Sequence, residues 1–254
     1  MNIKTLAVAR RHVFQGSTVH LLCVLFCLLY LRADASESWQ EGLAGMPLNS
    51  NVSQLNRSNC VDIMLRAFQS NDVVKALIFM PGATDEFYMF RRAKADLTNA
   101  APSLLDAVSA LTNQTLIRVT FHPPLLLLHT DEDPLEPMIE VEYQALAEKL
   151  KQSHFVGHVF FNDRDWDFIQ PILKSTFKMN VRPWRYSYDS WHFYRHSFAG
   201  WALTGWEALE SVALAGKTRF SVRGKPGFSL QRPQLIFHYD ARVLATPKFD
   251  EFPR

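Results

Sequence analysis

The chain has 254 residues and a formal net charge of +2, and 48% of its residues are hydrophobic and 13% aromatic. This length and apolar content suit one or two globular domains with a sizeable core. The weak charge gives no electrostatic basis for binding nucleic acid, so we expect no nucleic-acid partner.

The N-terminus has the pattern of an export signal. A leader with basic residues precedes an apolar run at 19–31, which has signal-peptide length and is short for a membrane span. Ala33 and Ala35 are small residues at the positions that determine cleavage, and they predict cleavage after Ala35. Residues 1–35 are therefore expected to be a signal peptide, and the protein to be secreted or periplasmic. The alternative is an anchor retained through 19–31, and only then do we expect contact with a membrane.

Removal of residues 1–35 would change both the charge and the cysteine content. Of the 27 basic and 25 acidic residues in the chain, 23 and 24 would remain, which leaves the mature protein near neutrality. Cys60 would be the remaining cysteine, so an internal disulfide is excluded. We expect Cys60 to be a buried small side chain, with an intermolecular disulfide or a catalytic thiol as alternatives.

The chain after the signal divides into an arm, two units and a linker. Residues 36–59 are rich in Ser, Asn and Gly, and they predict a flexible arm. Residues 60–130 are predicted as a first α+β unit. The acidic, proline-containing stretch 131–141 is predicted as a linker to a second α+β unit at 142–254.

Both units alternate helical and strand patterns. In the first unit, helices are predicted at 61–70, 85–97 and 102–111, and strands at 73–80 and 116–121. In the second unit, helices are predicted at 142–152 and 168–177, and strands at 155–161, 218–223 and 234–239.

The second unit also contains an aromatic-rich stretch, residues 184–201. Alternation of Trp184, Tyr186 and Tyr188 with polar residues predicts a strand. Residues 189–201 are predicted to continue as a helix, because their apolar residues recur at helical spacing. The buried stripe of this helix would consist of Trp191, Tyr194, Phe198 and Trp201.

A further helix is predicted directly after this stretch. Thr204 and Glu207 have the spacing of a capping box, in which each residue's side chain binds the other's backbone amide. The helix that they begin would bury Trp206, Leu209 and Val212.

A shift of the chain by 104 positions aligns the aromatic-rich stretch with an earlier segment. The matched pairs include Asp85 with Asp189, Arg91 with Arg195, Leu105 with Leu209, and Val108 with Val212. The apolar stripe recurs as well, at Phe87, Phe90 and Leu97. We therefore predict an α+β fold of two similar strand–helix–helix–strand units, which is consistent with internal duplication.

The aromatic-rich stretch is the first candidate for a ligand site. Flat aromatic rings beside polar groups suit sugars or peptides. The residues of this candidate site are Trp184, Tyr186, Tyr188, Asp189 and Arg195. The alternative is that these rings form part of the buried core.

A metal site is the second candidate. His192 and His196 are four residues apart, so on one helix they would share a face and could bind one divalent metal ion together with Asp189. The pair lacks the internal glutamate of a metalloprotease motif, and a polar helix face is the alternative. No other cofactor is expected.

Two further groups of polar residues follow the strand pattern at 155–161 or flank it. His154 and His158 would lie on one side of a strand or helix. Asp163, Asp165 and Asp167 could hold a hard cation, or they could cap the helix that follows.

These features favour an exported, non-enzymatic protein that binds an unknown partner, a protein or a glycan, outside the cytoplasm. The sequence contains no phosphate loop, dinucleotide fingerprint, nucleophile elbow or paired-cysteine zinc spacing. One alternative is a metal-dependent hydrolase or transferase that uses His192, His196 and Asp189. The other is a membrane-tethered structural protein that keeps residues 19–31.

The cleavage site gives a direct test of the export signal. We expect the secreted protein to begin at Ser36, because the small residues before it match the requirement of signal peptidase. Intact mass and N-terminal sequencing of the protein from an extracytoplasmic fraction measure this. A chain that still carries residues 19–31 would instead support the anchored alternative.

Overall fold

The computed structural model describes residues 39–48, 52–56, 59–80, 94–130, 139–154, 157–183, 195–216, 218–223 and 234–239. From Gly42 onward the chain forms one compact unit, and of the other unit, Met1–Glu41, only residues 39–41 are described. The predicted signal peptide and its cleavage site lie outside these ranges. Among the described residues, no helix is both long and apolar enough to cross a membrane.

A five-stranded mixed sheet runs through the main unit. Its strand order is β4-β5-β2-β9-β7, and β2 runs parallel to β5 while the other neighbours are antiparallel. The strands are β2 (Ala76–Phe79), β4 (Arg118–His122), β5 (Leu125–His129), β7 (His158–Arg164) and β9 (His196–Trp201). Every residue of β2 and β5 is buried, because these inner strands are covered on both faces.

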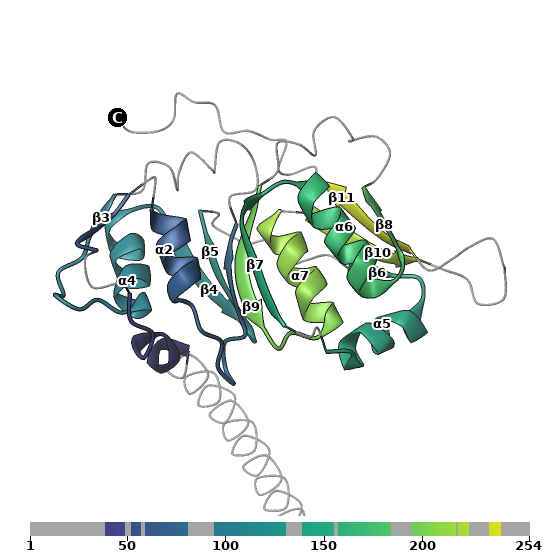
Figure 1. Ribbon diagram of the computed structural model, residues 1–254, viewed down its shortest axis with the longest axis horizontal. Coiled ribbons are helices and arrows are strands. Elements are labelled where there is room, and N and C mark those ends of the chain that lie inside the picture. The colour runs from purple at the N-terminus through teal and green to yellow at the C-terminus, as the bar shows by residue number, and fades with distance from the viewer. Residues whose placement is uncertain are drawn as a thin grey trace, which may run out of the picture. The chain divides into compact units, whose positions relative to one another are not determined.

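Residue alternation gives this sheet two covered faces. Ile78, Leu127, Phe161 and Phe198 lie side by side on one face, and they pack into the main core. Leu77 and its same-face neighbours are buried on the other. Figure 1 shows helices on both sides of the sheet, with α2 (Cys60–Ala67) and α4 (Leu104–Gln114) on one side.

A second sheet of four strands has the order β6-β10-β11-β8. Its strands are β6 (Ile139–Val141), β8 (Asn180–Pro183), β10 (Thr218–Arg223) and β11 (Gln234–Tyr239). The central pair, β10 and β11, is antiparallel and places Phe220 opposite Phe237. Both rings join the same main core as the first sheet. A short two-stranded sheet pairs β1 (Gln54–Leu55) with β3 (Ala95–Asp96).

Helix α7 (Gly205–Ala215) packs against both large sheets. It lies against β2 and β9 of the five-stranded sheet and against β10 of the four-stranded sheet, and it also contacts α5 (Gln144–Gln152). Eight of its residues are buried: Gly205, Ala208, Leu209, Ser211, Val212, Ala213, Leu214 and Ala215. A helix that is apolar on most sides is stable only in an interior, and here two sheets provide it.

The start of α7 confirms the capping box expected from the sequence. The Thr204 side chain accepts a hydrogen bond from the Glu207 backbone, and the Glu207 carboxylate accepts one from the Thr204 amide. Leu209 and Val212 are buried as predicted, whereas Trp206 is half-buried. The Trp206 indole donates to the Glu210 carboxylate at 2.8 Å.

The helix predicted over 189–201 is wrong for the described part of that range. His196–Trp201 form β9, the strand between β2 and β7. An inner strand is apolar on both faces, so the alternation of polar and apolar residues that identifies a strand is missing. The three-residue spacing of Phe198 and Trp201 matched a helix by coincidence. The two side chains lie on opposite faces of the sheet. Phe198 is fully buried, and Trp201 is 51% exposed.

Other predicted boundaries also change. The arm predicted over 36–59 contains a helical turn at 39–44 and strand β1, so its described residues belong to folded structure. The linker predicted over 131–141 ends in β6, and Leu97, the end of the helix predicted over 85–97, follows β3. The four leucines at 125–128 form β5 together with His129, and no strand was predicted there.

Strand β8 was not predicted, and the remaining elements follow the expected helices and strands closely. Helix α4 begins after a capping box formed by Ser103 and Asp106, and α6 (Trp166–Phe177) begins after Asp165. Strands β2 and β9 come from the two predicted units and pair with each other. The fold is therefore mixed α and β, and its five-stranded sheet draws strands from both predicted units.

Gly205 provides a test of the packing around α7. Intrinsic helix propensity favours alanine over glycine by up to about 1 kcal/mol. A Cβ at Gly205 would, however, lie 2.7 Å from Ser153 Oγ and 3.1 Å from the Leu150 carbonyl oxygen. We expect Gly205→Ala to lower the free energy of unfolding by about 1–3 kcal/mol, as overpacking does.

Urea denaturation of the purified protein measures this change. Gly45→Ala is the matched control, because its Cβ would meet its nearest neighbour at an ordinary 3.6 Å. A Gly205→Ala variant as stable as the wild type would contradict the packing described for α7.

Candidate functional site

Three rings form a row on the surface of β7 and β9. The ring centroid of His158 lies 6.0 Å from that of Trp201 and 5.9 Å from that of Phe160. Trp201 and His158 are exposed, and Phe160 is half-buried. We call Trp201, His158 and Phe160 the aromatic row. It is ordered aromatic surface at the end of the strand order, because β7 is the outermost described strand on that side.

The register of the sheet creates the aromatic row. His158 is paired directly with Trp201, and Phe160 follows two positions later on the same face of β7. The chain then leaves β9 through Ala202, whose φ of 53° is in the left-handed region. Phe198 and Phe161 point to the opposite face and into the core, where their rings meet edge to face at 5.1 Å.

Polar side chains border the inner end of the aromatic row. The Arg66 guanidinium of α2 lies 5.8 Å from the centre of the Phe160 ring. Arg66 Nε donates to Asp62 Oδ2 at 2.8 Å, and Asn162 Nδ2 of β7 donates to Asp62 Oδ1 at 2.8 Å. We call Arg66, Asp62 and Asn162 the polar end. Since Asp62 and Arg66 are paired at the surface, the polar end carries no net charge.

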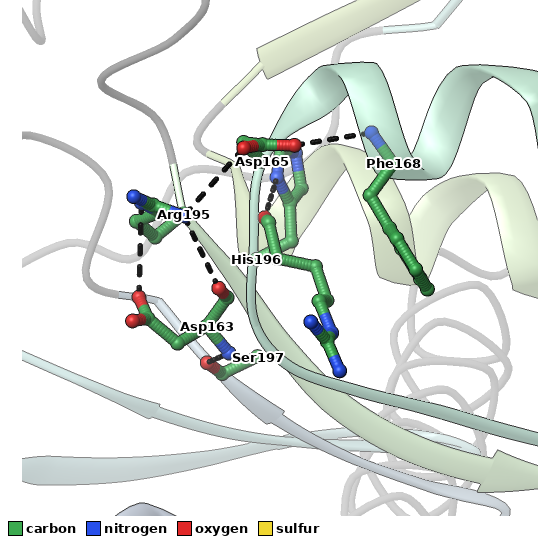
Figure 2. A network of polar contacts seen from close by, with 7 residues as sticks. Asp163, Asp165, Phe168, Arg195, His196 and Ser197 are labelled. Atoms are coloured by element: carbon green, nitrogen blue, oxygen red, sulfur yellow. Dashed lines mark hydrogen bonds and ion pairs between the residues drawn. The ribbon is translucent and has the colours of Figure 1, made fainter.

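A bulge interrupts β7 beyond the polar end. The register with β9 shifts between Phe161 and Arg164, and Asp163 has a left-handed φ of 53°. The Asp163 amide donates to Ser197 Oγ at 2.9 Å, and its carbonyl accepts from Arg195 Nη1 at 3.4 Å. These contacts hold the bulge against the start of β9, as Figure 2 shows.

Arg195 lies between two carboxylates at this bulge (Figure 2). Its Nε is 3.9 Å from Asp163 Oδ1, and its Nη1 is 3.7 Å from Asp165 Oδ2. All three side chains are partly exposed, so each ion pair contributes little, on the order of 0–1 kcal/mol. Asp165 also caps α6, because its Oδ1 accepts from the Phe168 amide at 3.0 Å. Helix capping, one of the two alternatives for these aspartates, is therefore confirmed for Asp165.

His196 is fully buried below this cluster. Its Nδ1 lies 3.3 Å from the Arg164 carbonyl oxygen, which fixes Nδ1 as the protonated nitrogen. Its Nε2 has no hydrogen-bond partner in the described structure and faces Gly216 at the end of α7. Burial lowers the pKa of His196 to about 4, against smaller opposing effects of the Arg164 carbonyl and the Asp165 charge. The imidazole is thus neutral at ordinary pH.

The predicted metal site falls mostly outside the described residues, which do not include His192 and Asp189. His196 belongs to a strand, so the shared helical face assumed for the two histidines does not extend to it. No group of three or more His, Cys, Asp or Glu side chains in the described ranges is arranged to hold a metal ion. The metal site stays a prediction from the sequence.

The predicted ligand site is also only partly described. Trp184, Tyr186, Tyr188 and Asp189 lie outside the described residues, and Arg195 is described in the cluster above. The two histidines predicted to share one side separate, because only His158 belongs to β7. The Cys60 thiol is buried, which raises its pKa to about 12 and removes its reactivity as a thiolate.

Sequence reasoning missed the aromatic row as a unit. Trp201 was assigned to a buried stripe, and His158 was paired with His154. The signal that could have found the row is the alternation of His158 and Phe160 with Val159 and Phe161. Its partner Trp201 is more than forty residues away, and only strand pairing brings them together.

The buried imidazole gives a pH-dependent prediction. The folded-state pKa of His196, about 4, lies below the value of 6.5 expected in the unfolded chain. The stability that the neutral His196 imidazole contributes is therefore fully present above pH 6.5. It is lost as the pH falls from 6.5 to 4, and the free energy of unfolding decreases by an amount on the order of 3 kcal/mol. Urea denaturation at a series of pH values measures this loss.

His196→Leu should remove this part of the pH dependence, and His154→Gln, at the surface, is the matched control. An unchanged difference in stability between pH 7 and pH 4 in His196→Leu would show that the imidazole is not responsible.

Comparisons with known proteins give no relative from which a function could be transferred. No protein-family model, no curated protein and no solved structure matches the chain. The aromatic row, its polar end and the cluster at the bulge are therefore interpreted from their geometry and chemistry.

Proposed function

We propose that this chain is an exported, non-enzymatic protein that binds a ligand outside the cytoplasm through the aromatic row. The observation that carries this proposal is the exposed indole of Trp201, which an ordered strand holds at the surface beside His158. A large ring kept in water forgoes the energy of burial, and a ligand that covers the ring recovers it.

The surroundings of the aromatic row support recognition of a defined ligand. Strand pairing fixes the backbone of Trp201 and His158, so no backbone conformational entropy is lost when their rings are covered. The polar end lies beside the rings and supplies a carboxylate, an amide and a guanidinium. Orienting polar groups next to apolar rings are typical of small-ligand sites.

Export is the second part of the proposal. The basic leader, the apolar run at 19–31 and the small residues before Ser36 support it. Cleavage there gives a secreted or periplasmic protein, as expected above.

Internal duplication is a third, structural part of the proposal. Two features of the described structure support it. Ser103 and Thr204 each begin a capping box, and the helices that follow, α4 and α7, each lead into a strand. The two caps are 101 positions apart and not 104, so this support concerns the order of the elements and not the residue-by-residue alignment. The two segments are similar in local structure, but the strands that end them, β4 and β10, belong to different sheets.

Hydroxyl-radical footprinting tests whether the aromatic row is a binding surface without assuming the class of ligand. The purified protein is labelled alone and after addition to the extracytoplasmic fraction of the cells that produce it. We expect oxidation of Trp201 to fall severalfold in the fraction, because a bound ligand covers the indole. Phe168 is the internal control, since it is 45% exposed and lies on α6.

Equal protection of Trp201 and Phe168, or no protection of either, would overturn the proposed surface. Protection limited to Trp201 and His158 would support it.

A further inference from the structure

We infer that the ligand of the aromatic row is an uncharged glycan chain. This inference rests on the proposed function, and it names the class of molecule that the row binds. The pyranose ring has faces of C–H groups and a rim of hydroxyls, so it can stack on an aromatic ring while its edge forms hydrogen bonds. The row and its polar end present these two requirements side by side.

The width of the row distinguishes a glycan from a protein partner. The core of a protein interface is a contiguous apolar patch from which charged residues are depleted. The aromatic row is a single line of rings, and Asp62 and Arg66 lie at its inner end. The other large apolar side chains exposed in the described structure belong to other elements or to a loop, and they are Leu116, Val141 and Phe168.

The polar end supplies hydrogen-bonding groups of both kinds. Arg66 uses Nε for Asp62, its side chain is 66% exposed, and no hydrogen bond in the described structure uses its two Nη groups. Those groups can donate to hydroxyl oxygens. The Asp62 carboxylate has further acceptor capacity for hydroxyl protons, beyond its bonds to Arg66 and Asn162.

Charge selects among glycans. The Asp62 carboxylate and the Arg66 guanidinium are 2.8 Å apart, so their fields largely cancel. A uronate or sulfate placed on Arg66 would also lie close to Asp62, and the like charges would repel. An uncharged chain meets no such penalty, and its hydroxyls can use both groups.

Affinity electrophoresis with soluble polysaccharides tests the inference. Native gels contain an uncharged polymer, either xylan, galactomannan or hydroxyethylcellulose, or an acidic one, either alginate or polygalacturonate. We expect at least one uncharged polymer to retard the protein, and Trp201→Ala to weaken this retardation about tenfold or more, as loss of a central aromatic contact does. Phe168→Ala, at a ring of similar exposure outside the row, should migrate as the wild type does.

The outcomes separate this inference from the proposed function. Retardation by acidic polymers alone, or by none of the polymers, would overturn the uncharged glycan. So would retardation by an uncharged polymer that Trp201→Ala leaves unchanged.

A footprinting arm identifies the source of any protection. The extracytoplasmic fraction is treated beforehand either with periodate, which cleaves sugar diols, or with a protease, and the reagent is quenched. Loss of Trp201 protection after periodate alone supports the glycan. Loss after protease alone overturns the glycan and leaves the proposed binding surface in place, and absence of protection in the untreated fraction overturns both.

Discussion

Burial of α7 between the two large sheets is the constraint on which the rest of the described structure depends. The helix follows β9 of one sheet and precedes β10 of the other, so short connections hold the two sheets on either side of it. Full burial of Leu209 and Val212 contributes about 1.5–3 kcal/mol each. The capping box contributes about 1 kcal/mol more by satisfying amides at the start of the helix. Without α7, the side chains of β2, β9 and β10 that it covers would be exposed to water.

The position of β9 determines where a ligand can bind. Helix α7 packs against β9 and β2, which the strand order places inside the sheet, and β7 is the outermost described strand on that side. Pairing of β7 with β9 places Phe161 and Phe198 in the core and leaves His158 and Trp201 exposed at the edge of the opposite face. The bulge at Asp163 then ends the regular pairing next to Arg195. The same strand pair thus supplies core packing on one face and aromatic surface on the other.

Local signals in the sequence predicted α7, α4 and α6 because their determinants lie within a few residues of each other. The capping pair Thr204 and Glu207 is an example, as is the cap at Asp165. Strand β9 was mistaken for a helix because an inner strand has no polar face to reveal its period. The candidate site was predicted in part: Arg195 and Asp165 were singled out separately, and their contact was not. The aromatic row depends on pairing between distant segments, which no local pattern encodes.

The contact between His196 and Gly216 joins the first residue of β9 to the residue that ends α7. A methyl group at position 216 would lie 2.3 Å from the imidazole Nε2, so the two positions share one small volume. Enlarging one of them requires shrinking the other. Relatives of this protein, as they diverge, should therefore exchange these residues together, for example a larger residue at 216 with a smaller one at 196. Such paired replacement would record the packing of strand against helix in sequences alone.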